Sequence, residues 1–318
     1  MLEIKHLYKR YGRFLALNDM NLHVEQGELF GFVGSNGAGK TTTMRICVGL
    51  LEATAGEVYI GGQDVLQSRK AMSERIGYVP DFFGVYNSFS ALEYLEFFAA
   101  SYGIYGDEAK QLCLDLLKLV KLSDKANADV NGLSRGMKQR MCLARALVHN
   151  PDILFLDEPA SGLDPKARFE LKEILKNLSS MGKTIVISSH ILPELAEMCT
   201  SVGIIDRGHM VLKGTIDEVH RAAAMSSPIL IAVAEEGVEQ TFSLLQEVPN
   251  VHKVTAQGNR LSVMFDGGKE EETALLKKMV MEDIPVYSFT RQEGSLESLF
   301  MQIVGKNRNA GGKAGGRR

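Results

Sequence analysis

The spacing of apolar residues changes repeatedly along the chain and predicts the order of its elements. Residues 28–33 (ELFGFV), 153–159 (ILFLDEP) and 184–190 (TIVISSH) contain short apolar runs, which are typical of strands buried in a parallel sheet. A helical pattern occupies 40–51, and 56–65 (GEVYIGGQDV) reads as a hairpin with a Gly-Gly turn. Strands that alternate repeatedly with helices predict an α/β domain with a mostly parallel core sheet.

Two further regions have a different pattern. A helical insertion is predicted where apolar residues recur at helical spacing, at Leu92, Leu95, Phe98, Leu112, Leu116 and Leu119. From residue 229 onward the segments run strand, helix, strand, strand, helix, strand and a last helix, which predicts a ferredoxin-like module. The predicted organisation is a main domain over 1–219 with its helical part at about 82–150, a linker at 220–228, the module at 229–305 and a disordered basic glycine-rich tail at 306–318.

Composition narrows the class of protein. The chain has 318 residues, of which 45% are hydrophobic and 24% charged, as in ordinary globular proteins. A net charge of −3 argues against a general nucleic-acid binder, so no nucleic-acid partner is expected. The four cysteines show neither paired nor metal-ligand spacing, and we expect reduced core thiols. No apolar run approaches the ~20 residues of a spanning helix, so any membrane part must come from another chain.

A phosphate-binding loop is the strongest motif. GSNGAGKT matches G-x-x-x-x-G-K-[ST] between a predicted strand and a predicted helix, the context that makes this motif specific. Its glycines let backbone N–H groups surround a triphosphate. Lys40 can reach the β- and γ-phosphates, and the Thr41 hydroxyl can bind Mg²⁺. The predicted nucleotide-binding residues here are Gly34, Ser35, Asn36, Gly37, Ala38, Gly39, Lys40, Thr41 and Thr42.

Two acids follow another buried strand. Asp157 ends that strand, where ligands of open α/β sheets bind, and is predicted to hold Mg²⁺ through water. Glu158 can reach the water that attacks the γ-phosphate, as its base or its orienter. His190 ends a third apolar run and can touch the γ-phosphate, although a lone histidine is as often structural.

A second phosphate-binding feature lies in NGLSRGMKQRM (131–141). Ser134 can cap a helix that begins near Gly136, which leaves backbone N–H groups pointing outward and attracts anions. The chain already has a stronger phosphate site in its glycine loop. One chain therefore carries two sites for what is expected to be one nucleotide.

Together these motifs resemble the nucleotide-binding subunit of an ABC transporter, over residues 1–219. The resemblance implies an ABC ATPase domain of the P-loop NTPase fold, with parallel core sheet, antiparallel β subdomain and helical subdomain, that binds ATP and Mg²⁺. It identifies Tyr11 as the adenine-stacking aromatic, Glu158 as catalytic and His190 as the switch histidine. It also identifies the D-loop (Ser161, Gly162, Leu163 and Asp164) and the signature (Leu133, Ser134, Arg135, Gly136 and Met137).

The family explains the two phosphate sites, because its domains pair head to tail. Each ATP then lies between the glycine loop of one chain and the signature of the other, so Ser134 and Gly136 would meet ATP held by the partner's Lys40. Three positions depart from the usual pattern: Arg135 replaces a glycine, Met137 replaces a glutamine and Asp81 replaces a glutamine that contacts Mg²⁺ and water. A carboxylate at Asp81 still binds metal but adds negative charge near ATP.

The partners follow from the same resemblance. We expect a separately encoded membrane permease and a second copy of the chain, at the cytoplasmic face of the plasma membrane. Aromatics crowd residues 82–105, and Phe82, Phe83 and Tyr86 are candidates to receive the permease, although such a stripe is more often core. The ending SLESLFMQIVG resembles the small domain of ABC-2-type exporter ATPases.

The sequence therefore predicts an ATP-hydrolysing subunit of an exporter. Alternatives are an importer subunit whose C-terminal domain senses a ligand, a soluble ABC ATPase outside transport, and a regulatory protein that holds ATP without turnover. The C-terminal module is also open to a role as a dimerisation surface.

Overall fold

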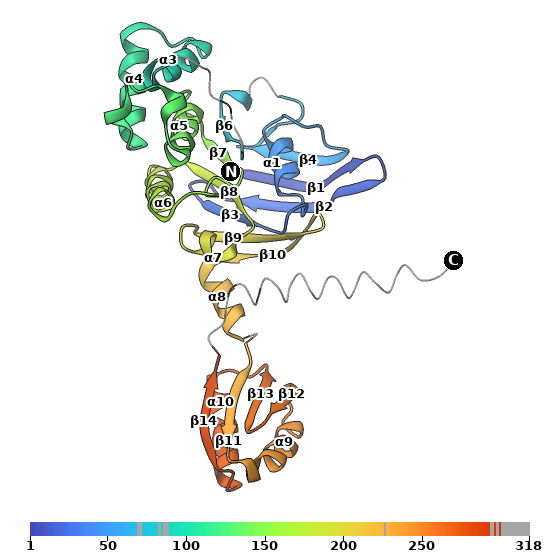
Figure 1. Cartoon of the computed structure of the whole chain (residues 1–318). Coiled ribbons are helices and arrows are strands. Elements are labelled where there is room, and N and C mark those ends of the chain that lie inside the picture. Colours follow the sequence, from blue (N-terminus) through green and yellow to red (C-terminus); the bar gives the residue numbers. More distant parts are fainter. Residues whose placement is uncertain are drawn as a thin grey trace. The chain divides into compact units, whose positions relative to one another are not determined.

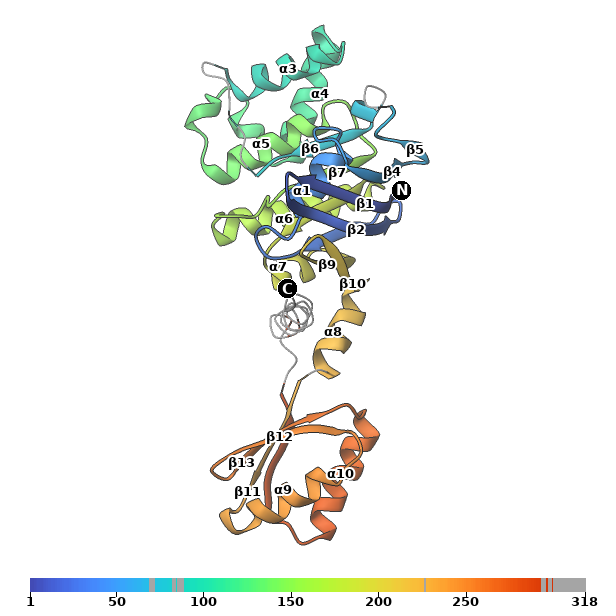
Figure 2. The same ribbon diagram turned by 90° about the vertical axis from the view of Figure 1, so that its right-hand side faces the viewer.

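A computed structural model describes residues 1–68, 72–81, 84, 89–225, 227–292, 296 and 299. Contacts divide the chain into two units, Met1–Gly214 and Thr215–Arg318. The first unit contains two β-sheets and the second contains one, and each unit has its own hydrophobic core (Figures 1 and 2). No helix of the described residues is long and apolar enough to cross a membrane.

The first unit is built on a six-stranded sheet of order β10-β9-β3-β8-β7-β6. Its strands are β3 (Leu29–Val33), β6 (Ile76–Val79), β7 (Ile153–Leu156), β8 (Thr184–Ser189), β9 (Ser201–Asp206) and β10 (His209–Thr215). The pairs β6–β7, β7–β8, β8–β3 and β3–β9 are all parallel. Every residue of β3, β7 and β8 is buried, which explains why their sequences read as continuous apolar runs.

The first unit also contains an antiparallel sheet of order β2-β1-β4-β5. Its strands are β1 (Leu2–Tyr11), β2 (Phe14–Val24), β4 (Ala55–Ile60) and β5 (Gln63–Asp64). Gly61 and Gly62 form the predicted turn, and both have positive φ. Side chains of both sheets and of α1 (Lys40–Cys47) share one core, which includes Leu7, Val58, Phe30 and Phe155. The helix predicted over 40–51 ends earlier, because Gly49 has φ 75°.

Several helices follow β6 in the sequence of this unit. They are α3 (Ala91–Ser101), α4 (Gly106–Leu119), α5 (Arg135–Leu147), α6 (Pro165–Ser180) and α7 (Leu192–Ala196), with short 3₁₀ turns at Ser123–Lys125 and Val130–Gly132. Ser90 and Glu93 form a capping box at α3, which fixes the start of this helix at Ala91. In Figure 1, α3, α4 and α5 gather on one side of the sheets.

The second unit contains a four-stranded antiparallel sheet of order β12-β13-β11-β14. Its elements are α8 (Ile216–Met225), β11 (Ile229–Val233), η3 (Glu235–Gly237), α9 (Val238–Gln246), β12 (Val251–Gln257), β13 (Arg260–Phe265), α10 (Lys269–Met281) and β14 (Val286–Arg291). This βαββαβ order with adjacent β11 and β13 confirms the ferredoxin-like prediction. Its core joins Ile229, Ile231 and Val263 of the sheet to Leu245 of α9 and Met279 of α10.

The segment that the sequence predicts as a linker differs from the prediction. Residues 220–228, predicted as a linker, are helical as far as Met225. Thr215 and Glu218 bond each other's backbone N–H groups at the start of α8, and an alanine-rich stretch follows with high helix propensity. Phe82, Phe83, Tyr86 and the tail 306–318 lie outside the described residues, as does the last predicted helix except Leu296 and Leu299.

Candidate nucleotide-binding and hydrolysis site

The glycine loop connects β3 to α1 and lies close against neighbouring backbone. A Cβ at Gly34 would lie 2.6 Å from the carbonyl oxygen of Ile205, and one at Gly39 would lie 2.7 Å from Leu17. Gly39 has φ 115° and Gly37 has φ 80°, a region that favours glycine. Space therefore requires glycine at 34, backbone conformation favours it at 37, and both apply at 39.

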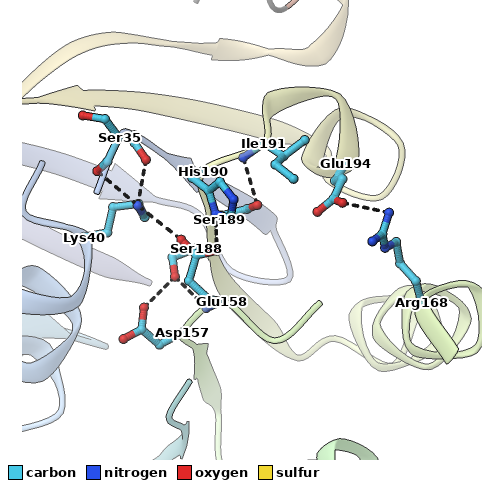
Figure 3. A network of polar contacts seen from close by, with 11 residues as sticks. Ser35, Lys40, Asp157, Glu158, Arg168, Ser188, Ser189, His190, Ile191 and Glu194 are labelled. Atoms are coloured by element: carbon cyan, nitrogen blue, oxygen red, sulfur yellow. Dashed lines mark hydrogen bonds and ion pairs between the residues drawn. The ribbon is translucent and has the colours of Figure 1, made fainter. Parts of the chain in front are cut away.

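Lys40 is the first residue of α1, and its side chain is only 5% exposed. Its Nζ donates to the Gly34 carbonyl at 2.7 Å and lies 3.2 Å from Oε1 of Glu158 (Figure 3). A buried ammonium is stable only with such partners. This contact joins the glycine loop to the end of β7, two segments that are far apart in the sequence.

The acids that follow β7 are held by β8. Ser188 donates from its hydroxyl to Oδ1 of Asp157 at 2.7 Å and accepts from the backbone N–H of Glu158 at 2.9 Å. Asp157 is 1% exposed, and Glu158 has φ 48°. Left-handed backbone is costly for such a residue and is found mainly at functional sites. Ser188 thus holds the carboxylate of Asp157 and the backbone of Glu158 in place.

His190 completes this polar chain. Its Nδ1 lies 2.9 Å from Oε2 of Glu158, so one carboxylate contacts both Lys40 and His190. The His190 ring is 46% exposed, whereas Glu158 is 16% exposed. The histidine therefore lies on the solvent side of the carboxylate, where an entering phosphate group can reach it (Figure 3).

A cleft of about 390 Å³ opens over these groups. It is lined by Tyr11, Phe14, Ala16, Asn36, Gly37, Gly39, Lys40, Thr41, Thr42, Asp81 and Glu158. Tyr11 is 46% exposed and Phe14 is 61% exposed, so two aromatic rings are available at the cleft. Phe14 was missed by the sequence analysis, although it stands in the same YKRYGRF stretch as Tyr11.

The metal-binding candidates also reach this region. The described residues contain no group of three or more His, Cys, Asp or Glu side chains arranged for a metal. Thr41, Asp81 and Asp157 instead offer hydroxyl and carboxylate oxygens, the donors that suit Mg²⁺ held mainly by phosphates and water. Desolvation and the negative charges of Asp157 and Glu158 raise the pKa of Asp81, while Arg135 opposes this rise. A cation would relieve that repulsion, so the donor set fits Mg²⁺.

The signature residues lie at the start of α5. Ser134 caps α5 by accepting from the Met137 N–H at 3.3 Å, as predicted. Gly136 is packed so closely on α6 that a Cβ there would lie 2.6 Å from Cβ of Ala167. None of the signature residues lines the cleft described above.

The D-loop lies beside the signature in the same chain. A Cβ at Gly162 would lie 2.5 Å from Nη1 of Arg135, so this guanidinium is held over the D-loop. Asp164 caps α6 by accepting from the Ala167 N–H at 2.9 Å. Signature and D-loop therefore form one continuous surface supported by the first turn of α6.

Comparison with known proteins agrees with this geometry. A model of the family described as ABC transporter matches residues 17–161, and one described as ATP-binding protein DrrA1-3-like, C-terminal domain matches residues 214–304. The linearmycin resistance ATP-binding protein LnrL of Bacillus subtilis (strain 168) is 30% identical over 96% of this chain and 99% of its own length. The chain belongs to the ABC transporter family.

Other members support the assignment. The Nod factor export ATP-binding protein I of Burkholderia orbicola (strain AU 1054) is 34% identical over 96% of this chain and 97% of its own length. A dimeric structure of MJ0796, a bacterial ABC transporter cassette, superposes with a TM-score of 0.62 at 30% identity, covering 68% of this chain and 99% of that one. A post-hydrolysis state of that cassette, bound to ADP and Pi, superposes with a TM-score of 0.61 at 29% identity. The match covers 68% of this chain and 99% of that one. This ABC family member is accordingly an ATP-binding protein and an ATPase.

Proposed function

We propose that this chain is the ATP-hydrolysing subunit of an exporter and works as a head-to-tail homodimer bound to a separate permease. One observation carries the proposal: the signature surface of Ser134 and Gly136 lies outside the cleft that holds Lys40 and Glu158. A helix N-terminus with a serine cap suits a phosphate, and the cleft supplies only the other half of a site. A second copy in head-to-tail orientation supplies the missing half to each cleft.

Each residue of the cleft has a distinct role in the proposed reaction. ATP phosphates replace Glu158 as the partner of Lys40, which frees the carboxylate to orient the attacking water and accept its proton. His190 then lies between the carboxylate and the terminal phosphate, where it stabilises developing charge. Tyr11 and Phe14 offer faces on which adenine stacks. Bound Mg²⁺, held by Thr41, Asp157 and Asp81, would neutralise phosphate charge.

The permease is proposed to dock beside α3 and α5. A groove of about 310 Å³ is lined there by Val48, Leu50, Ser73, Ile76, Tyr78, Phe98, Tyr102, Arg145, Ala146 and His149. Tyr102 stacks on His149 with ring centroids 4.3 Å apart, and Leu50 is 66% exposed. These exposed apolar and aromatic side chains suit an amphipathic helix that presents apolar residues.

The direction of transport is taken from the relatives. Two relatives that match almost the whole chain are named for resistance to linearmycin and for export of Nod factor. Export by this chain is therefore proposed, with the protein at the cytoplasmic face of the plasma membrane. An acidic substitution of exposed Leu50 should release the permease without changing ATP binding, and co-purification of the two chains measures this.

Glu158→Gln tests the ATPase and the dimer together. The amide has nearly the size of the carboxylate but cannot accept a proton from water, so turnover should fall by roughly 10²-fold or more. Lys40 and Thr41 still hold the nucleotide. The variant should therefore accumulate as a dimer with ATP and Mg²⁺ and as a monomer with ADP, measured by light scattering. The head-to-tail proposal fails if the hydrolysis-deficient variant remains monomeric with ATP, both alone and with the permease.

A further inference from the structure

Two ion pairs join the helix that follows the D-loop to the helix that follows His190. Nη1 of Arg168 in α6 lies 2.8 Å from Oε1 of Glu194 in α7, as drawn in Figure 3. One turn along α6, Nζ of Lys172 lies 3.0 Å from Oε2 of Glu197. Residues four apart share one helix face, so the two pairs lie in succession along the same helix–helix contact.

The α6 end of the first pair is tied to the partner-facing surface. Arg168 follows Ala167, against which Gly136 of the signature packs, and Ala167 donates its N–H to the D-loop residue Asp164. The backbone N–H of Arg168 also donates to the carbonyl of Asp164. A shift of the signature or the D-loop must therefore move the first turn of α6, which includes Arg168.

The α7 end is tied to the hydrolysis site. Glu194 stands four residues after His190, and the intervening Ile191 N–H donates to the hydroxyl of Ser189 at 3.1 Å. α7 begins at Leu192, two residues after His190, so only a short connection separates Glu194 from the His190 loop. His190 in turn contacts Glu158. A displacement of Glu194 is thereby passed to the group that holds the catalytic carboxylate.

We infer that Arg168 and Glu194 form a positioning pair, which makes placement of His190 in one chain depend on engagement of that chain's signature and D-loop by the partner. This rests on the proposed head-to-tail dimer, and it adds a route by which each chain's own ATP site responds to the other. Neither residue lines the nucleotide cleft, so they act only through the elements they join. The route is contiguous, from Gly136 through α6, Arg168, Glu194 and α7 to His190.

The second ion pair provides a matched control. Lys172 and Glu197 join the same two helices, yet Lys172 lies a turn farther from the D-loop and Glu197 lies beyond the last residue of α7. Its members are 23% and 69% exposed, against 40% and 15% for Arg168 and Glu194. A merely structural role predicts that loss of either pair lowers stability without changing how ATPase activity depends on ATP concentration. A positioning role predicts a change in kcat and Hill coefficient for the first pair alone.

The experiment compares the full-length variants Arg168→Ala, Glu194→Gln and Lys172→Ala in ATPase assays over a range of ATP concentrations. For the first two, we expect kcat to fall about fivefold or more and the Hill coefficient to drop toward one, while ATP affinity changes less than twofold. Lys172→Ala should match wild type in kcat, in Hill coefficient and in ATP affinity. Glu194→Gln keeps the size of the side chain, so it reports on the charge even where Arg168→Ala folds poorly. The exchange of Arg168→Glu with Glu194→Arg should recover most of the lost kcat.

Two results would overturn the inference: equal kcat and Hill coefficient in Arg168→Ala and Lys172→Ala, or an exchange variant no better than the single ones. Adding Glu158→Gln to each variant separates this failure from failure of the dimer proposal. If Glu158→Gln alone forms no ATP-dependent dimer, the head-to-tail proposal has failed. If it dimerises with and without Arg168→Ala, and Arg168→Ala alone hydrolyses ATP normally, only the positioning pair has failed.

Discussion

Nδ1 of His190 lies 2.9 Å from Oε2 of Glu158, whereas Lys40 contacts the other oxygen, Oε1, of the same carboxylate. The carboxylate is thus held between a buried ammonium and a half-exposed imidazole. In the proposed reaction, phosphate replaces Glu158 as the partner of the Lys40 ammonium, and the imidazole remains to direct the carboxylate toward water. The proposal therefore gives His190 a role both before and after ATP binds.

His190→Ala should lower kcat by about 10²-fold, the usual scale for losing one preorganised group at a developing charge. ATP affinity should change little, because Lys40 and the glycine loop remain. A single-turnover assay with a nucleotide titration separates the two quantities. His23→Ala, at an exposed histidine paired with Glu25, is the control and should match wild type. A fall in affinity with unchanged kcat would assign His190 to binding rather than hydrolysis.

Asp81→Gln should leave ATPase activity equal or raise it. Asp157 and Glu158 repel the Asp81 carboxylate, and the amide removes that charge while keeping an oxygen that can bind metal or water. Activity measured against Mg²⁺ concentration checks this. A tenfold loss, rescued by more Mg²⁺, would show that the carboxylate itself is the required metal ligand.

Gly136→Ala should push α5 away from α6, because the added Cβ would lie 2.6 Å from Cβ of Ala167. Overpacking of this kind costs about 1–3 kcal/mol, so the free energy of unfolding should fall by that amount. ATP binding to the monomer should survive, while the ATP-dependent dimer in the Glu158→Gln background should be lost. Gly132→Ala is the matched control, since nothing lies within 4 Å of a Cβ there. Intact dimers with Gly136→Ala would show that this packing does not position the signature.

The cysteines should be inert in the folded protein. Burial raises the pKa of Cys47 to about 12 and that of Cys113 and Cys142 to about 11, and it raises the pKa of Cys199 as well. The reactive thiolate forms only as pH approaches these values, so alkylation near pH 8 should be negligible. Mass spectrometry after iodoacetamide treatment should find four modifications in denaturant and none in native protein. Rapid labelling of any one of these cysteines in the native protein would contradict its burial.

Much of the site was predictable because its signals are local. A short apolar run places a strand, glycines after it permit the loop, and the next residues form α1 with Lys40 at its start. The same reasoning located Asp157 and Glu158 after β7 and the capping of α5 by Ser134. Backbone preference and side-chain periodicity act over a few residues, so the sequence alone carries them. The βαββαβ order of the second unit was readable for the same reason.

Other features depended on which distant segments the sheet brings together. Ser188 holds Asp157 only because β8 lies beside β7, and Phe14 reaches the cleft only because β2 lies beside the glycine loop. The contact of Arg135 with Gly162 and the Arg168–Glu194 pair depend on how α5, α6 and α7 pack. Sequence determined the residue types and the elements that carry them. Tertiary structure decided which side chains meet, because packing between distant elements leaves no periodic trace in the chain.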